Sequence, residues 1–65
     1  MNITILNKEY DINIRYLYLI NKQLQSLPAE IGNLINLQKL DLSSNQLQSL
    51  SDEIFNLINL QILYL

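Results

Sequence analysis

Residues 37–59 read LQKLDLSSNQLQSLSDEIFNLIN, and this stretch explains the organisation of most of the chain. The preceding residues 14–36 read IRYLYLINKQLQSLPAEIGNLIN, and residues 60–65 begin a third copy with LQILYL. Between residues 23–38 and 46–61, thirteen of sixteen positions are identical. Such agreement at a fixed offset is typical of an internal repeat. The sequence therefore predicts a repeat protein with units 14–36 and 37–59 and a partial unit 60–65.

Each unit opens with the spacing L-x-x-L-x-L, in which Ile14 takes the first slot of the first unit. Leu17 and Leu19 alternate with Tyr16 and Tyr18, and alternation of period two predicts a short strand with the leucines on one face. Strands that recur every 23 residues with a crossover between them pair in parallel. We therefore expect a small parallel sheet with leucine on its inner side.

The second half of each unit is expected to return along the other side of the molecule as a helical turn. The fixed φ of Pro28 suits the first position of a helical or 3₁₀ turn. Ser51 at the equivalent place, or Asp52 beside it, is expected to cap the second turn. Ile31 and Leu34 have the i,i+3 spacing of an inward stripe, which recurs in the second unit. A helical bundle is disfavoured, because leucine spacings of three, two and five residues do not keep a helical phase.

Residues 1–13 depart from the repeat and alternate instead, which predicts a β-hairpin. Placing a two-residue turn at Asn7-Lys8 pairs the apolar residues with one another: Ile5 with Tyr10 and Ile3 with Ile12. The polar residues then share the opposite face. We expect this hairpin to lay its apolar side over the open end of the first repeat, because terminal repeats need a cover.

The pattern L-x-x-L-x-L-x-x-N-x-L of residues 37–47, with Leu-Pro-x-x-Ile at residues 27–31 of the first unit, resembles the leucine-rich repeat family in its common 23-residue form. The resemblance covers residues 14–65. It implies an α/β fold, a right-handed solenoid with short parallel strands on the concave face and short helical or 3₁₀ turns on the convex face. Residues 1–13 would be an N-terminal β-hairpin cap within the same single domain. The resemblance also implies that Asn45 points inward and satisfies backbone groups, whereas Lys22 in the equivalent slot should point outward.

The composition argues against catalysis. The chain of 65 residues contains no Cys and no His, which removes the usual metal ligands and the commonest general base. No serine lies in a G-x-S-x-G elbow, and the pair Lys39 and Ser43 is better explained as a polar surface. A single glycine cannot form a phosphate-binding loop. We expect a non-enzymatic protein with no cofactor and no metal.

Charge and hydropathy argue against other partners. The net charge is −2 and there is no block of like charges, so we expect neither nucleic acid nor a membrane surface as a partner. The longest apolar run is far shorter than a membrane span. Residues 1–13 lack the basic-then-apolar pattern of a signal peptide, which favours a cytoplasmic location.

The outward strand residues are the candidate binding surface. Stacked at 23-residue intervals, they form columns that hold three of the four tyrosines, and tyrosine offers large contact area with a polar handle. Strand propensity alone also favours aromatic residues, but exposed tyrosine and isoleucine together favour a protein or peptide ligand. The resemblance implies the same surface. The candidate residues are Tyr16, Tyr18, Ile20, Lys39, Asp41, Ser43, Ile62 and Tyr64.

The last strand is predicted to have a bare hydrogen-bonding edge, because no further unit follows it in the sequence given. Exposed edges recruit other strands, so we expect a homodimer in which two copies of this strand meet antiparallel. The edge comprises Leu60, Gln61, Ile62, Leu63, Tyr64 and Leu65. The alternatives to a ligand-binding module are a self-assembling structural unit and the N-terminal fragment of a longer leucine-rich-repeat protein.

Overall fold

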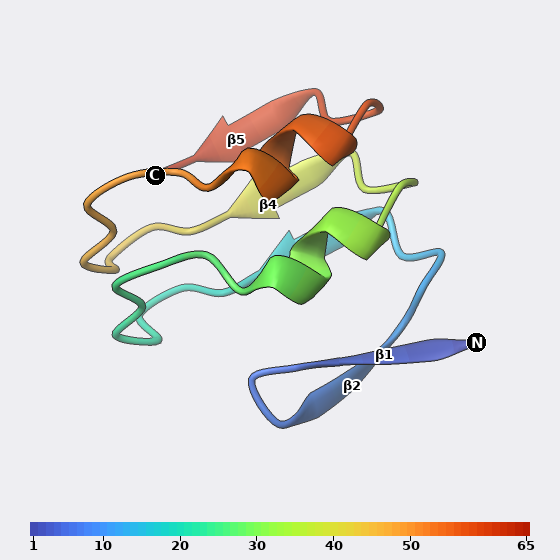
Figure 1. Cartoon of the computed structure of the whole chain (residues 1–65), viewed down its shortest axis with the longest axis horizontal. Coiled ribbons are helices and arrows are strands. Elements are labelled where there is room, and N and C mark those ends of the chain that lie inside the picture. Colours follow the sequence, from blue (N-terminus) through green and yellow to red (C-terminus); the bar gives the residue numbers. More distant parts are fainter.

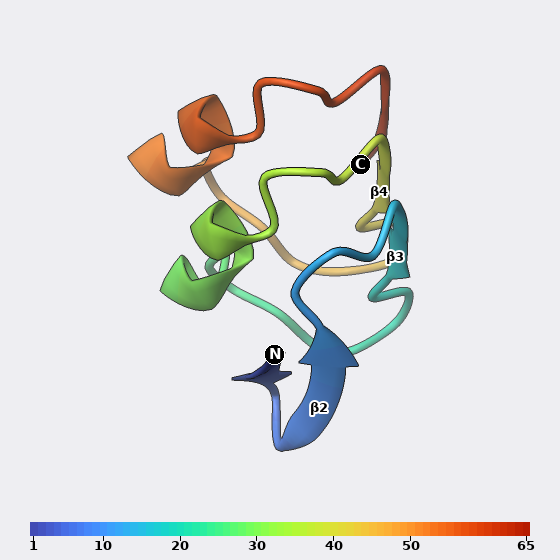
Figure 2. The same cartoon turned by 90° about the vertical axis from the view of Figure 1, so that its right-hand side faces the viewer.

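The computed structural model describes all residues 1–65. The chain forms two sheets and two 3₁₀ turns, which are joined by loops (Figure 1). The elements are β1 (Asn2–Ile5), β2 (Lys8–Asp11), β3 (Tyr16–Tyr18), η1 (Ala29–Asn33), β4 (Lys39–Asp41), η2 (Asp52–Asn56) and β5 (Ile62–Tyr64). Strands β1 and β2 pair antiparallel, while β3, β4 and β5 pair in parallel in chain order. The strands line one side, the turns line the other, and the hairpin lies at one end (Figure 2). The predicted parallel pairing is confirmed.

The register of the parallel sheet follows the 23-residue repeat without a slip. Leu17, Leu40 and Leu63 stand side by side on neighbouring strands. Each strand has an inward leucine between two residues that face outward, as the alternation predicts. A slip of one residue would reverse every side chain, so the repeat spacing fixes which residues are available on the surface.

The core fills the space between the sheet and the 3₁₀ turns. Leu40 is fully buried, and burying a leucine of this kind contributes about 1.5–3 kcal/mol. All eleven buried apolar residues are leucine or isoleucine, drawn from both repeats and from the hairpin: Ile5, Leu17, Leu19, Leu24, Leu27, Ile31, Leu34, Leu37, Leu40, Leu42 and Leu57. The repeats therefore share one core and neither encloses its leucines alone.

The 3₁₀ turns differ in two details from the sequence prediction. Pro28 is the residue before η1, with φ −60° and ψ 133°, and the turn itself begins at Ala29. Extended backbone at this position leaves the proline ring outside the helical residues. Ser51 occupies the corresponding position before η2, but its side chain makes no capping hydrogen bond. The inward stripe of Ile31 and Leu34 is confirmed, since both are fully buried.

The hairpin is present, but its predicted register is wrong. Ile3 pairs with Tyr10 and Ile5 pairs with Lys8, and the turn residues are Leu6 and Asn7. Both turn residues have positive φ, 51° and 66°, as a tight two-residue hairpin turn of the mirror-image type requires. A shift of the pairing by two residues leaves every side chain on its face, but it sets Ile5 opposite Lys8, so matching residues by polarity selected the wrong register.

Asn45 joins the two repeats through its side-chain amide. Its Oδ1 accepts hydrogen bonds from the backbone N–H groups of Lys22 at 2.8 Å and Leu24 at 3.1 Å. Its Nδ2 donates to the carbonyl oxygens of Leu19 at 2.7 Å and Leu42 at 2.9 Å. The amide thus pairs backbone groups of both units. Lys22, in the equivalent slot of the first unit, is exposed as predicted.

A second asparagine column, not anticipated from the sequence, lies before the strands. Asn36 Nδ2 donates to Asn13 Oδ1 at 3.0 Å, across an offset of 23 residues. Asn59 Nδ2 donates to the carbonyl oxygen of Ile35 at 2.9 Å. The recurrence of asparagine at these three positions is the sequence signal that could have indicated this column.

Candidate protein-binding surface

The outward side of β3, β4 and β5 carries the predicted candidate residues together on one surface, here called the sheet face. Its rows are Tyr16–Lys39–Ile62 and Tyr18–Asp41–Tyr64, with Ile20 and Ser43 just beyond the strands. The three tyrosines are about half exposed, from 48% to 58%, and the two isoleucines are similar at 41% and 44%. The sheet face is therefore an exposed aromatic and aliphatic surface on a short parallel sheet.

Lys39 lies at the centre of the sheet face, on the middle strand. Its Nζ is 5.4 Å from the ring centroid of Tyr18 and 5.4 Å from that of Tyr64. Each contact is a cation–π interaction, which contributes about 0.5–1 kcal/mol at an exposed site. The side chain thus reaches diagonally toward two tyrosines of the neighbouring row, and Lys39 is half-buried.

Asp41 is the carboxylate of the sheet face, and Ser43 binds it. The Ser43 hydroxyl donates to Asp41 Oδ1 at 2.6 Å, and the Ser43 backbone N–H donates to the same oxygen at 3.0 Å. These two bonds, the hydroxyl first, hold the pKa of Asp41 below its ordinary value of 3.8, and the charge of Lys39 acts in the same direction. Asp41 therefore stays negatively charged at neutral pH, and its Oδ1 already accepts two hydrogen bonds from Ser43.

The sequence placed these residues on one surface but did not indicate their mutual contacts. The 23-residue columns predict lateral neighbours, whereas Lys39 contacts the tyrosines diagonally. The D-x-S spacing of Asp41 and Ser43 is a sequence signal for a local side-chain hydrogen bond to the backbone. That signal could have identified the pair before the structure was known.

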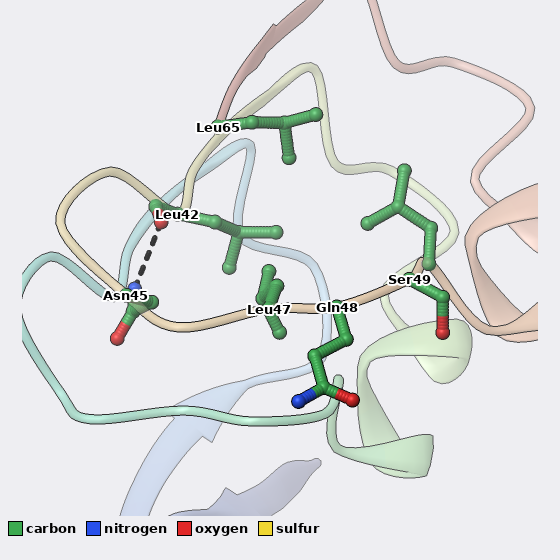
Figure 3. Close-up of a pocket in the computed structure, with 7 residues that line it drawn as sticks. Leu42, Asn45, Leu47, Gln48, Ser49 and Leu65 are labelled. Atoms are coloured by element: carbon green, nitrogen blue, oxygen red, sulfur yellow. Dashed lines mark hydrogen bonds between the residues drawn. The ribbon is translucent and has the colours of Figure 1, made fainter.

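A separate hollow lies at the end of the second repeat, beyond β4 (Figure 3). It has a volume of about 220 Å³, and Leu42, Leu47, Leu50 and Leu65 form its apolar lining. Leu65 is 69% exposed and Leu50 is 37% exposed. In the sheet, β5 pairs only with β4. In the second repeat Leu57 is buried, Leu47 and Ile54 are half-buried and Leu50 is exposed, so this end of the core is only partly covered.

Parallel strands offset by a constant 23 residues, 3₁₀ return turns and a bridging asparagine define a repeat protein whose units share one core. The family model for leucine-rich repeats, in a form with two copies, matches residues 12–52. The chain belongs to the leucine-rich repeat family. Membership indicates a solenoid-like fold, and domains of this family generally mediate protein–protein interactions and are typically non-catalytic.

A search of curated proteins finds none that matches the chain. The helical elements are two five-residue 3₁₀ turns, and neither has the length or hydropathy to cross a membrane. Acidic residues do not gather anywhere in a group of three that could hold a metal ion.

Proposed function

We propose that the chain is a non-catalytic module that binds another protein through the sheet face. The observation that carries this proposal is the exposed tyrosine and isoleucine surface centred on Lys39. Tyrosine and other aromatic residues are enriched where proteins bind one another, because they give large contact area at small conformational cost. The surface lies on paired strands, so its side chains are held in fixed relative positions.

In this proposal the hairpin acts as the cap of the first repeat. Ile5 is buried in the common core, and Ile3 and Tyr10 pack against it. The repeats would form a right-handed solenoid, since crossovers between parallel strands are almost always right-handed. The hairpin leaves the sheet face open, because β1 and β2 form a sheet of their own.

The test is to select binding peptides from a random displayed library against the 65-residue chain and to map their site by NMR. We expect amide shifts to concentrate on β3, β4 and β5. The double variant Tyr18→Ala/Tyr64→Ala should bind the selected peptides at least tenfold more weakly, because truncating aromatic anchors typically costs more than 1 kcal/mol each. The control Glu30→Ala/Glu53→Ala, on the turns, should bind as the parent does. Equal losses in both variants would assign binding to the turn side instead.

Self-association of the 65-residue chain is a second candidate, favoured by the free edge of β5 and the apolar hollow beside Leu65. Two β5 strands would pair antiparallel, each supplying the other with the backbone hydrogen bonds that its edge lacks. A further repeat in a longer chain would occupy the same edge.

Light scattering tests this association. We expect a dimer at tens of micromolar, the range of a weak complex by affinity arithmetic. Leu65→Lys should give a monomer, because it places a charge on the edge, whereas Ile58→Lys, at a side chain 81% exposed elsewhere, should leave the dimer intact. A cooperatively folded monomer of the unmodified chain at that concentration would end the idea.

A further inference from the structure

The ammonium group of Lys39 lies near two tyrosine rings and forms no salt bridge with any carboxylate of the chain, although its charge acts on Asp41. Two tyrosine rings flank it at equal distance. Its Nζ takes part in none of the side-chain hydrogen bonds of the molecule. A lysine ammonium carries three N–H donors and a full positive charge. Ring faces stabilise the charge without accepting hydrogen bonds in the way that a carboxylate does, so the donors remain available to a ligand.

The neighbouring carboxylate of Asp41 is bound by Ser43 and accepts no hydrogen bond from Lys39. Both the hydroxyl and the backbone N–H of Ser43 donate to Asp41 Oδ1. The Cα atoms of Lys39 and Asp41 are about 7 Å apart along β4, but the Lys39 ammonium reaches toward the Tyr18 and Tyr64 rings on either side of Asp41. The sheet face therefore presents an ammonium group with free donors and, near it, a carboxylate whose Oδ1 is already bound by Ser43.

The surroundings of Lys39 are apolar but contain further donors. Tyr16 and Ile62 flank it in its own row, and both are exposed. The hydroxyls of the three sheet-face tyrosines hydrogen-bond no group of the protein. A phenol hydroxyl can donate to an anionic oxygen while its ring packs on an apolar side chain.

We propose, building on the proposed function, that the sheet face recognises an acidic protein segment: a Glu or Asp side chain placed against Lys39 and flanked by apolar residues. The carboxylate would accept hydrogen bonds from Nζ and from tyrosine hydroxyls. The flanking apolar side chains would pack on the tyrosine rings and on Ile62. Asp41 determines how the acidic segment is aligned on the sheet face. Its charge repels a second carboxylate and favours a hydrogen-bond donor or a basic side chain in the part of the segment that lies over Asp41.

The chain's net charge of −2 makes this recognition local. A protein with an overall negative charge does not attract acidic ligands over long distances. The preference must therefore arise at Lys39 itself, and a single substitution should remove it.

The experiment is a double-mutant cycle on a peptide selected from the random library. The parent chain and Lys39→Met are each titrated with the selected acidic peptide and with its Glu→Gln form, followed by fluorescence anisotropy. We expect Lys39→Met to weaken binding of the acidic peptide roughly two- to fivefold, the range for one partly exposed charge pair. Binding of the Gln peptide should not change.

Lys8→Met is the matched control, because Lys8 Nζ lies 5.5 Å from the Tyr10 ring on the hairpin, away from the sheet face. It removes the same charge and the same kind of ring contact, and it should bind both peptides as the parent does. Lys39→Gln provides a second neutral variant if circular dichroism shows that Lys39→Met does not fold.

The outcomes separate this inference from the proposed function. Selected peptides that need Tyr18 and Tyr64 but show no Asp or Glu preference would overturn the acidic-segment inference and leave the proposed function standing. Peptides that map to the turns would overturn both. Displacement of the acidic peptide by inorganic phosphate at similar concentration, or binding of phosphatidylserine vesicles that is lost in Lys39→Met, would show general anion binding and would also overturn the inference.

Discussion

Replacing Asn45 with alanine should remove much of the stability of the chain. Four hydrogen bonds of 2.7–3.1 Å join its amide to backbone groups of both repeats. A net hydrogen bond contributes about 0.5–1.5 kcal/mol. The bond to the Lys22 N–H is exposed and counts least, so the loss should be about 2–4 kcal/mol. A domain of this size has a free energy of unfolding of about 3–10 kcal/mol.

Urea unfolding followed by circular dichroism measures the effect. With a slope of about 1 kcal/mol/M, the midpoint should fall by about 2–4 M, or the variant should be unfolded in buffer. Hydrogen exchange should first lose protection at the amide of Leu24, which Asn45 Oδ1 pairs. Asn33→Ala is the control, because Asn33 is exposed and its amide makes no hydrogen bond. Equal midpoints for the two variants would refute the bridging role of Asn45.

Two further substitutions test the packing of the turns and the charge of the sheet face. Gly32→Val should lower the free energy of unfolding by about 1–3 kcal/mol, measured by urea unfolding. Even a Cβ at Gly32 would lie 3.2 Å from Glu53 Cβ and 3.4 Å from the Glu53 carbonyl oxygen, which leaves no room for two more methyl groups. A variant as stable as the parent would show that η1 and η2 can separate freely. Ser43→Ala should raise the pKa of Asp41 part of the way back toward 3.8 in an NMR titration, whereas Ser44→Ala should not change it. Because the pKa of Asp41 is lower in the folded state, the ionised carboxylate stabilises the fold at pH values above its unfolded-state pKa, and this stabilisation is lost as the pH falls below about 4. The difference in free energy of unfolding between the parent and Ser43→Ala should shrink over the same pH range.

The sheet face shows how far the repeat alone could predict a site. The columns Tyr16–Lys39–Ile62 and Tyr18–Asp41–Tyr64 follow from the 23-residue offset, since parallel strands with equal spacing align equivalent residues. The contact of Lys39 with two tyrosines does not follow from it. A lysine side chain has several rotatable bonds, and its direction depends on the rings around it in three dimensions.

The inward role of Asn45 was implied by the resemblance to the leucine-rich repeat family. The sequence by itself determined the repeat length, the parallel strands and the inward leucines. Each of these depends on periodicity, and a period of two or of 23 residues fixes the face or the neighbour of a residue wherever the repeat is stacked. The tertiary structure alone decided the hairpin register, the absence of a side-chain cap at Ser51 and the position of the Lys39 ammonium between two rings. Each of these details depends on the packing of particular side chains and the geometry of particular turns, which the pattern of polar and apolar residues does not specify.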